Sequence, residues 1–258
     1  MIDFNKIYLQ DCITFMQKMK EESVDLIIAD PPYNLKKDFG NNSDHWKNVD
    51  SWLNWSKLWI DECIRVLKPT GNIFIYGIHH YLCFIQCYLY ERNMKYRRQI
   101  IWHYENGFSG YKTLNAFYEP ILWFSKTDNF TFNEIREPYK SLKRLKNKIF
   151  KNGKEWIPHA EGRLAGDVWK FPTLAGKRFE NEKTAHPTQK PLLLCNRLVN
   201  HFSNRKDLIY IPFAGSGSEC VSCLLHDRIF LATEINPQYI KIANERLKQT
   251  ISLEFQNS

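Results

Sequence analysis

The sequence predicts an α/β fold in which helices cover both faces of a mostly parallel sheet. Short apolar segments typical of buried strands alternate with longer segments typical of helices. Polar or glycine-rich motifs directly follow two of the apolar segments, at the strand ends where open α/β sheets bind their ligands. A chain of 258 residues is long enough to bury one such core and to carry an insertion.

Apolar runs and helix boundary signals place the individual elements. The expected strands span residues 6–10, 24–29, 72–76, 97–103, 119–125, 207–212 and 228–233. The expected helices span residues 11–20, 51–67, 79–92, 192–202, 218–226 and 238–247. The polar segment 34–48 is expected to be a mobile loop, and residues 130–183 are expected to be irregular and basic.

The most informative motif is Asp30-Pro31-Pro32-Tyr33, which directly follows the apolar segment 24–29. The two prolines fix their own φ angles, restrain the residue before them and donate no N–H. The motif therefore predicts a stiff turn that presents a carboxylate, backbone carbonyls and an aromatic ring to one pocket. Such a set suits a planar ligand with an exocyclic amine. The alternative to a ligand-binding role is that the motif is only a turn at the end of a core strand.

A second motif, Phe213-Ala214-Gly215-Ser216-Gly217, lies between an expected strand and the helix that begins at Ser218. Glycines in this setting let the backbone approach a ligand closely. The next strand ends at Glu234, an acid placed to bind ribose hydroxyls. Because no third glycine and no phosphate-binding lysine follow, a nucleoside cofactor without phosphates is favoured, and S-adenosylmethionine fits.

Together the two motifs resemble those of S-adenosylmethionine-dependent DNA amino-methyltransferases, which methylate the exocyclic nitrogen of adenine or cytosine. The catalytic motif precedes the glycine motif, as in the circularly permuted β class. Two further segments are similar to β-class elements: Asp167-Val168-Trp169, and His186-Pro187-Thr188-Gln189-Lys190-Pro191, which resembles the segment that closes over the cofactor. The resemblance covers residues 6–247. It implies a Rossmann-like methyltransferase fold with a seven-stranded sheet and a type II restriction–modification enzyme.

The resemblance also implies the site residues. The catalytic group is Asp30, Pro31, Pro32 and Tyr33. The cofactor group is Asp11, Asp30, Thr188, Gln189, Phe213, Gly215, Ser216, Gly217, Ser218 and Glu234. Asp11 is also a candidate helix N-cap, and no metal site is expected. Ile211 stands where the family usually has an acid, and Ser218-Glu219 follows the last glycine where the family usually has Thr.

The hypothesis for the mechanism is direct methyl transfer from the electrophilic sulfonium. Asp30 and the carbonyl of Pro31 or Pro32 would accept the two N–H bonds of the target amine, which draws its nitrogen toward tetrahedral geometry. Tyr33 would stack on a base flipped out of the duplex, and the 34–48 loop would close the site.

The choice of base follows from the first position of the motif. Asp30 favours adenine N6, since relatives that act on cytosine N4 mostly carry Ser there. Cytosine N4 is the first alternative and an RNA adenine methyltransferase the second. A non-catalytic DNA-binding module is the hypothesis from another functional class.

Most of the net charge of +8 comes from residues 136–183, which hold thirteen basic and six acidic side chains. This segment lies where β-class enzymes carry their target-recognition region, so duplex DNA is the expected partner. The candidate DNA-binding residues are Lys140, Lys143, Arg144, Lys146, Lys148, Lys151, Lys154 and Arg163. The expected division is a catalytic half (1–129), a target-recognition insertion (130–183) and a cofactor-binding half (184–258).

The composition indicates in which cellular compartment the protein is expected. The chain has no apolar run of the ~18 residues needed for a membrane span and begins without a secretory signal. Its seven scattered cysteines are expected to be reduced core thiols in a cytoplasmic, nucleoid-associated bacterial protein. A homodimer and a cognate restriction endonuclease are expected partners by resemblance. The helical spacing of Trp52, Trp55 and Trp59 predicts core packing.

Overall fold

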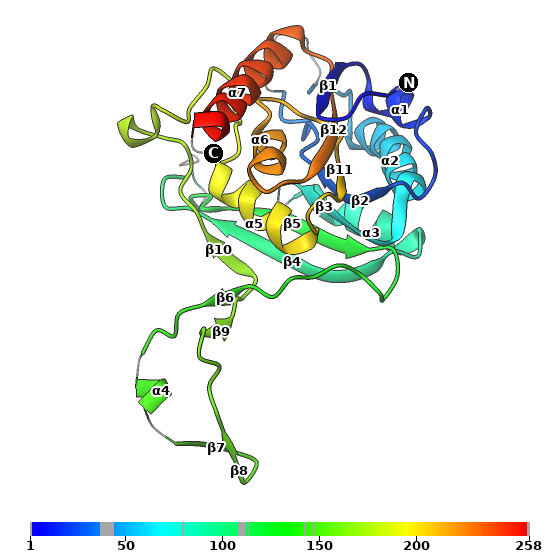
Figure 1. Cartoon of the computed structure of the whole chain (residues 1–258). Coiled ribbons are helices and arrows are strands. Elements are labelled where there is room, and N and C mark those ends of the chain that lie inside the picture. The colour runs from blue at the N-terminus through cyan, green and yellow to red at the C-terminus, as the bar shows by residue number, and fades with distance from the viewer. Residues whose placement is uncertain are drawn as a thin grey trace.

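The computed structural model describes residues 2–36, 44–78, 80–107, 112, 114–141, 143–146 and 148–256. Within these residues the chain folds around an eight-stranded sheet (Figure 1). Its strands are β1 (Lys6–Leu9), β2 (Val24–Ala29), β3 (Leu67–Tyr76), β4 (Lys95–His103), β5 (Tyr118–Ser125), β10 (Val168–Lys170), β11 (Leu208–Ile211) and β12 (Ile229–Glu234). They lie in the order β1-β12-β11-β2-β3-β5-β4-β10.

The sheet is mostly parallel, which confirms the predicted fold class. Strands β1, β12, β11, β2 and β3 pair in parallel, as do β4 and β10, whereas β5 runs antiparallel to β3 and β4. The predicted number of seven strands is wrong by one. The eighth strand, β10, is only three residues long, which is too short for a periodic signal, and it lies in the segment expected to be irregular.

Within the residues that the structure describes, six helices cover the two faces of the sheet. They are α1 (Cys12–Met16), α2 (Val49–Val66), α3 (Leu82–Glu91), α5 (Leu192–Phe202), α6 (Ser218–Leu225) and α7 (Pro237–Gln256). Helices α1, α2 and α3 belong to one core cluster, and α5, α6 and α7 to the other. Alternate residues of β2 divide between them: Leu26 and Ile28 face the second cluster, and Ile27 and Ala29 the first.

Local capping explains where the second helix begins. The Asn48 side chain accepts a hydrogen bond of 2.8 Å from the backbone N–H of Ser51, so α2 starts slightly before the expected residue. Helix α3 begins at Leu82 rather than at the expected residue 79, which itself lies outside the described residues.

The segment between β5 and α5 contains short elements that the sequence did not predict. They are β6 (Arg136–Glu137), α4 (Lys143–Lys146), β7 (Ile149–Lys151), β8 (Lys154–Trp156), β9 (Arg163–Leu164) and the 3-10 helix η1 (Lys177–Phe179). Strand β6 pairs with β9, and β7 pairs with β8. Residues 136–164 extend away from the sheet and are called the basic arm below (Figure 1). The division at 130 and 183 stays a prediction.

No helix of the part of the chain that the structure describes is long and apolar enough to cross a membrane.

Candidate active site

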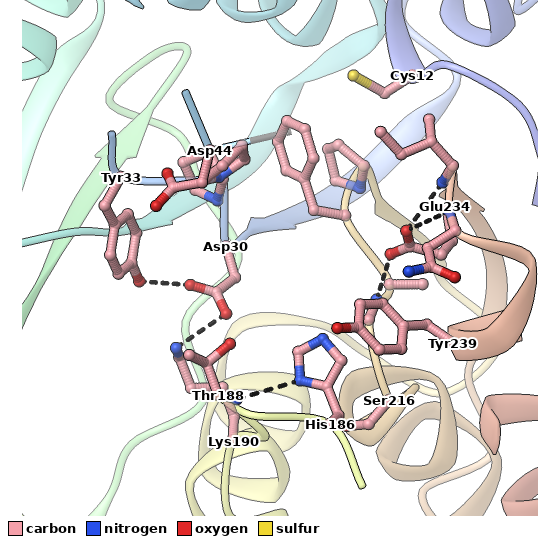
Figure 2. A pocket seen from close by; sticks show the side chains of 18 of the residues that line it. Cys12, Asp30, Tyr33, Asp44, His186, Thr188, Lys190, Ser216, Glu234 and Tyr239 are labelled. Carbon is pink, nitrogen blue, oxygen red and sulfur yellow. Dashed lines mark hydrogen bonds and ion pairs between the residues drawn. The ribbon is translucent and has the colours of Figure 1, made fainter. Parts of the chain in front are cut away.

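A cavity of about 300 Å³ opens where four neighbouring parallel strands end. The predicted residues that line it are Asp11, Asp30, Pro31, Pro32, Tyr33, Thr188, Gln189, Phe213, Gly215, Ser216 and Glu234. They come from the ends of β1, β2, β11 and β12 and from the segment before α5. The fold therefore brings together side chains from both ends of the chain in one cavity (Figure 2). Its volume lies at the lower end of the range typical of small-molecule pockets.

Asp30 lies between two partners at one side of the cavity (Figure 2). The Tyr33 hydroxyl donates a hydrogen bond to Asp30 Oδ1. The Lys190 ammonium lies 2.8 Å from Asp30 Oδ2. Both oxygens of the carboxylate are thus oriented before any ligand arrives, and each retains a further lone pair with which to accept a hydrogen bond.

Tyr33 is a permanent donor in this arrangement. Burial, followed by the charges of Asp30 and Glu119, raises the pKa of its phenol well above the usual value. The hydroxyl therefore keeps its proton across the physiological range and holds the Asp30 carboxylate.

The carbonyl of the second proline of the motif is hydrogen-bonded to a helix side chain. The indole N–H of Trp52 in α2 donates a hydrogen bond of 2.9 Å to the carbonyl oxygen of Pro32. This bond ties the turn to a buried side chain of the neighbouring helix and engages the Pro32 carbonyl.

Positive φ angles shape the glycine turn. Gly215 has φ +49°, and a Cβ there would lie 2.9 Å from His186 Nε2. Gly217 has φ +75°, and a Cβ there would lie 2.8 Å from the Cβ of Ala243 in α7. Glycine is thus required at both positions, for close approach and for left-handed backbone. Gly217 itself is not among the cavity-lining residues and instead precedes α6.

Glu234 is fixed by three backbone amides. Its Oε2 accepts from the N–H of Gly215 at 2.8 Å. Its Oε1 accepts from the N–H groups of Ile235 at 2.9 Å and Asn236 at 2.8 Å. Burial raises the pKa of Glu234, although these three donors favour the ionised form. The carboxylate has one orientation at the cavity wall and spare lone pairs for a hydroxyl ligand.

The segment before α5 is held largely by its own side chains. Gln189 Oε1 accepts from the backbone N–H and the hydroxyl of Thr184, both at 2.8 Å, and Gln189 Nε2 donates to the Glu182 carbonyl at 2.8 Å. The Gln189 amide therefore shapes the segment. The N–H of Thr188 donates to His186 Nδ1 at 3.3 Å.

Ser218 also differs from its expected surroundings. It is buried, does not line the cavity, and donates a hydrogen bond of 2.8 Å to the Lys190 carbonyl. Asp11 combines both of its predicted environments, because it caps α1 by accepting from the Thr14 N–H at 3.0 Å and also lines the cavity.

Several cavity-lining side chains were not among the predicted site residues: Lys190, His186, Trp46, Trp55 and Tyr239. Lys190 and His186 lie in the same motif as Thr188, and this was the signal available in the sequence. Burial lowers the pKa of His186 to about 4, so its ring is neutral at pH 7.

The prediction that the three tryptophans of α2 pack in the core is confirmed for two of them. Trp52 and Trp59 are buried. For Trp55 the prediction is incomplete, because this ring lines the cavity, with ring centroids 4.8 Å from Trp46 and 5.9 Å from Phe213. These rings make one wall of the cavity apolar.

The loop expected over residues 34–48 is described only at its two ends, since residues 37–43 lie outside the described residues. The Asp44 carboxylate accepts hydrogen bonds from the N–H groups of Asn34 at 2.6 Å and Leu35 at 2.9 Å. The ends of the segment are thus pinned together beside the cavity.

The basic residues of the arm lie apart from the cavity. The exposed ones are Lys140, Lys143, Lys146, Lys148, Lys154 and Arg163, whereas the side chains of Arg144 and Lys151 lie outside the described residues. Arg163 forms an ion pair of 3.1 Å with Glu137 across β6 and β9. Among the residues that the structure describes, no cluster of three or more His, Cys, Asp or Glu side chains could hold a metal ion.

Comparison with known proteins identifies the family. The model of the N6 and N4 DNA methylase family matches residues 24–245, most of the chain. The chain belongs to this family. It is 35% identical to the type II methyltransferase M1.MboII of Moraxella bovis, over 96% of this chain and 98% of that protein. It is also 35% identical to the DNA adenine methyltransferase YhdJ of Escherichia coli (strain K12), over 92% of this chain and 80% of that protein.

Solved structures share the fold. A DNA modification methylase of Thermus thermophilus, complexed with S-adenosyl-L-methionine, has a TM-score of 0.65 at 21% identity and covers 95% of this chain and 93% of its own. The cytosine-N4-specific PvuII DNA methyltransferase has a TM-score of 0.70 at 16% identity, with 93% and 85% covered. These structures confirm the fold, whereas the family model and the two sequence relatives confirm the predicted family and its class of activity, DNA methyl transfer.

Proposed function

We propose that the protein transfers a methyl group from S-adenosylmethionine to N6 of an adenine flipped out of duplex DNA. The observation that carries this function is the pair of fixed carboxylates in one cavity. Asp30 is held by Tyr33 and Lys190 at one side, and Glu234 is held by three backbone amides at another.

The cavity fits the cofactor. Glu234 would accept the ribose hydroxyls, the turn at Gly215 would let the backbone approach closely, and Trp55 and Phe213 would provide an apolar wall for the adenine ring. No basic side chain of a phosphate-binding loop follows the turn, in agreement with a cofactor without phosphates. When bound, S-adenosylmethionine supplies an electrophilic methyl group on sulfur.

Asp30 and Pro31 provide the acceptors for the target amine. The Pro32 carbonyl already accepts from Trp52 at 2.9 Å, so the Pro31 carbonyl is the better acceptor for the second N–H of the amine. Two such hydrogen bonds oppose delocalisation of the nitrogen lone pair into the ring and stabilise the positive charge that develops on nitrogen. Tyr33, beside them, would stack on the flipped base.

Adenine is favoured over cytosine by Asp30 at the first position of the motif. The Escherichia coli relative is named as an adenine methyltransferase. Cytosine N4 is the second candidate, because a cytosine-N4-specific enzyme shares the fold. The two bases present a similar amine, so the same acceptors could serve either of them.

Duplex DNA would meet the exposed lysines of the basic arm. Extruding one base costs a few kcal/mol, which contacts between lysines and phosphates can offset. The type II relatives support a modification enzyme that works beside a cognate restriction endonuclease. We further propose that it acts as a homodimer at the nucleoid in the bacterial cytoplasm.

The test is transfer of labelled methyl from S-adenosylmethionine to unmethylated genomic DNA, followed by nucleoside analysis. N6-methyladenine is the expected product. N4-methylcytosine would keep the mechanism and overturn the choice of base. Label in RNA alone would overturn duplex DNA as the substrate, and cofactor binding without any transfer would favour a DNA-binding module.

A further inference from the structure

Lys190 is a buried cation beside the catalytic carboxylate. Its side chain is 5% exposed, and its ammonium lies 2.8 Å from Asp30 Oδ2 and 3.4 Å from Glu119 Oε2. The contact with Glu119 is an ion pair without hydrogen-bond geometry, since Glu119 Oε2 makes no hydrogen bond within the described structure. A buried charge is tolerated only when it is paired, so this cluster is a built feature of the site.

Aromatic rings and one backbone contact hold Lys190 in place. Its ammonium lies 5.0 Å from the ring centroid of Tyr76, 5.7 Å from Tyr33 and 5.9 Å from Trp102. The Lys190 carbonyl accepts the Ser218 hydroxyl at 2.8 Å. Cation–π contacts and this bond restrict the lysine to one position, so it is a fixed part of the site rather than a mobile surface side chain.

The cluster has an uneven charge balance. Lys190 carries one positive charge between the carboxylates of Asp30 and Glu119, so the three groups together keep one negative charge. Asp30 lines the cavity, whereas Glu119, at the start of β5, is not among the lining residues. The lysine can thus orient Asp30 without cancelling the negative charge on which a developing cation depends.

From this geometry we infer that Lys190 is a positioning residue. Its ammonium fixes the plane of the Asp30 carboxylate for the target amine, and Glu119 balances the charge of the lysine. This rests on the proposed methyl transfer and adds two residues to the machinery of the site, Lys190 from the segment before α5 and Glu119 from β5.

Other ionisable groups face the same cluster. They are Glu219 of α6, His186 of the same segment, and the phenols of Tyr33, Tyr76 and Tyr104. Burial alone would lower the pKa of Lys190, but Asp30 and Glu119 outweigh it and raise the pKa, so the ammonium persists. Burial, followed by the charge of Asp30, raises the pKa of Glu219.

The experiment compares Lys190→Met, Glu119→Gln and the double variant with the wild-type protein. Initial rates of DNA methylation, measured across pH, give kcat and the acid limb of the pH–rate profile, which is the pH range in which kcat falls on acidification. Calorimetry gives the Kd for S-adenosylmethionine. Lys190→Met should lower kcat by about 100-fold, as expected when a catalytic group is misplaced. Its acid limb should move up by about one pH unit or more, because two uncompensated carboxylates favour protonation. The Kd should stay within about threefold, a change of less than 1 kcal/mol.

The double variant separates charge balance from folding. Glu119→Gln alone should lower kcat without moving the acid limb upward. In the double variant the acid limb should return toward its wild-type position while kcat stays low, since the charge is balanced but the orienting ammonium is missing. A purely structural lysine gives no such return. If Lys190→Met fails to fold, the double variant still tests the inference, because it removes one of the two carboxylates that the methionine leaves without a cation.

A matched control is Lys126→Met. Lys126 also forms a partly buried ion pair, 3.0 Å from Glu22, but is not among the cavity-lining residues. Its variant should keep the wild-type kcat and pH profile. Wild-type kcat and acid limb in Lys190→Met would overturn the inference while methylation by the wild-type protein upholds the proposed function. A wild-type protein that methylates no nucleic acid would overturn both.

Discussion

The Ser218 hydroxyl donates a hydrogen bond of 2.8 Å to the carbonyl oxygen of Lys190. Ser218 begins α6 directly after the glycine turn, and the Lys190 side chain contacts Asp30. One buried bond therefore joins the backbone at the glycine turn to the residue that pairs with Asp30. Arg246 of α7 adds to the connection by donating to Ser218 Oγ at 3.0 Å and to the Ser216 carbonyl at 2.7 Å.

Ser218→Ala should lower the free energy of unfolding by about 1–3 kcal/mol, because it leaves the buried Lys190 carbonyl without its donor. Urea denaturation followed by circular dichroism measures the change. Ser222→Ala, in the same helix, is the control. The Ser222 hydroxyl is buried and has no hydrogen-bond partner in the described structure, so its removal should leave stability unchanged or higher. Equal losses in the two variants would contradict a specific role for the Ser218 bond.

Asp30→Ala should reduce kcat for methylation by at least about 100-fold, since it removes the group that accepts the target N–H. The Kd for S-adenosylmethionine should change little, because the carboxylate of Glu234 keeps its three amide donors. Rapid-quench methylation and calorimetry measure the two quantities. Asp128→Ala, which removes an 81% exposed carboxylate paired with Arg97, should stay fully active. A fully active Asp30→Ala variant would show that another residue is the acceptor.

The sequence was informative about the central sheet because its strands are long apolar runs. The segment 24–29 divides its side chains between two cores, which requires apolar residues at nearly every position. The strand β10 was not predicted because only Trp169 of its three residues is buried. Its partner strand β4 lies about seventy residues earlier in the chain. A strand of three residues with one buried side chain leaves no local pattern.

In the candidate site, too, residues with a local sequence signal could be predicted, and residues that depend on distant contacts could not. The positions of Asp30 and Glu234 could be predicted, since Asp30 directly follows the buried strand β2 and Glu234 ends the buried strand β12. The burial of Lys190 could not be predicted, because a lysine is usually exposed. The carboxylates that pair with it come from distant parts of the chain, Asp30 after β2 and Glu119 in β5. The role of Gln189 could not be foreseen either, because its amide hydrogen bonds go to Thr184 and Glu182 in its own segment.

Charge reversal in the basic arm should weaken DNA binding by the protein. In the variant Lys140→Glu, Lys143→Glu, Lys146→Glu, the slope of log K against log salt should become shallower by about 0.9 for each phosphate that the arm no longer neutralises. Fluorescence anisotropy with a duplex at several salt concentrations gives the slope. Lys18→Glu with Lys20→Glu, both exposed and beside α1 at the opposite end of the molecule, is the control (Figure 1). Equal slopes in both variants would show that the arm does not bind DNA.

His186 should make stability depend on pH in a defined window. Burial lowers its pKa from the usual 6.5 to about 4 in the folded protein. Between these values the unfolded chain binds more protons than the folded one, so the free energy of unfolding rises with pH and is lost as pH falls. The loss should reach about 3 kcal/mol on going from pH 7 to pH 4.

The matched test replaces the titratable ring but keeps an acceptor for the Thr188 N–H, which the variant His186→Gln does. Subtracting its urea unfolding free energies from those of the wild-type protein, at each pH from 4 to 7, isolates the histidine from the carboxylates that titrate in the same range. The difference should grow as pH rises through the window and level off above pH 6.5. His159→Gln, which alters an exposed histidine of the basic arm, should leave the wild-type pH dependence intact. A flat difference for His186→Gln would mean that its ring is solvated in the folded protein and is no part of the buried wall beside Gly215.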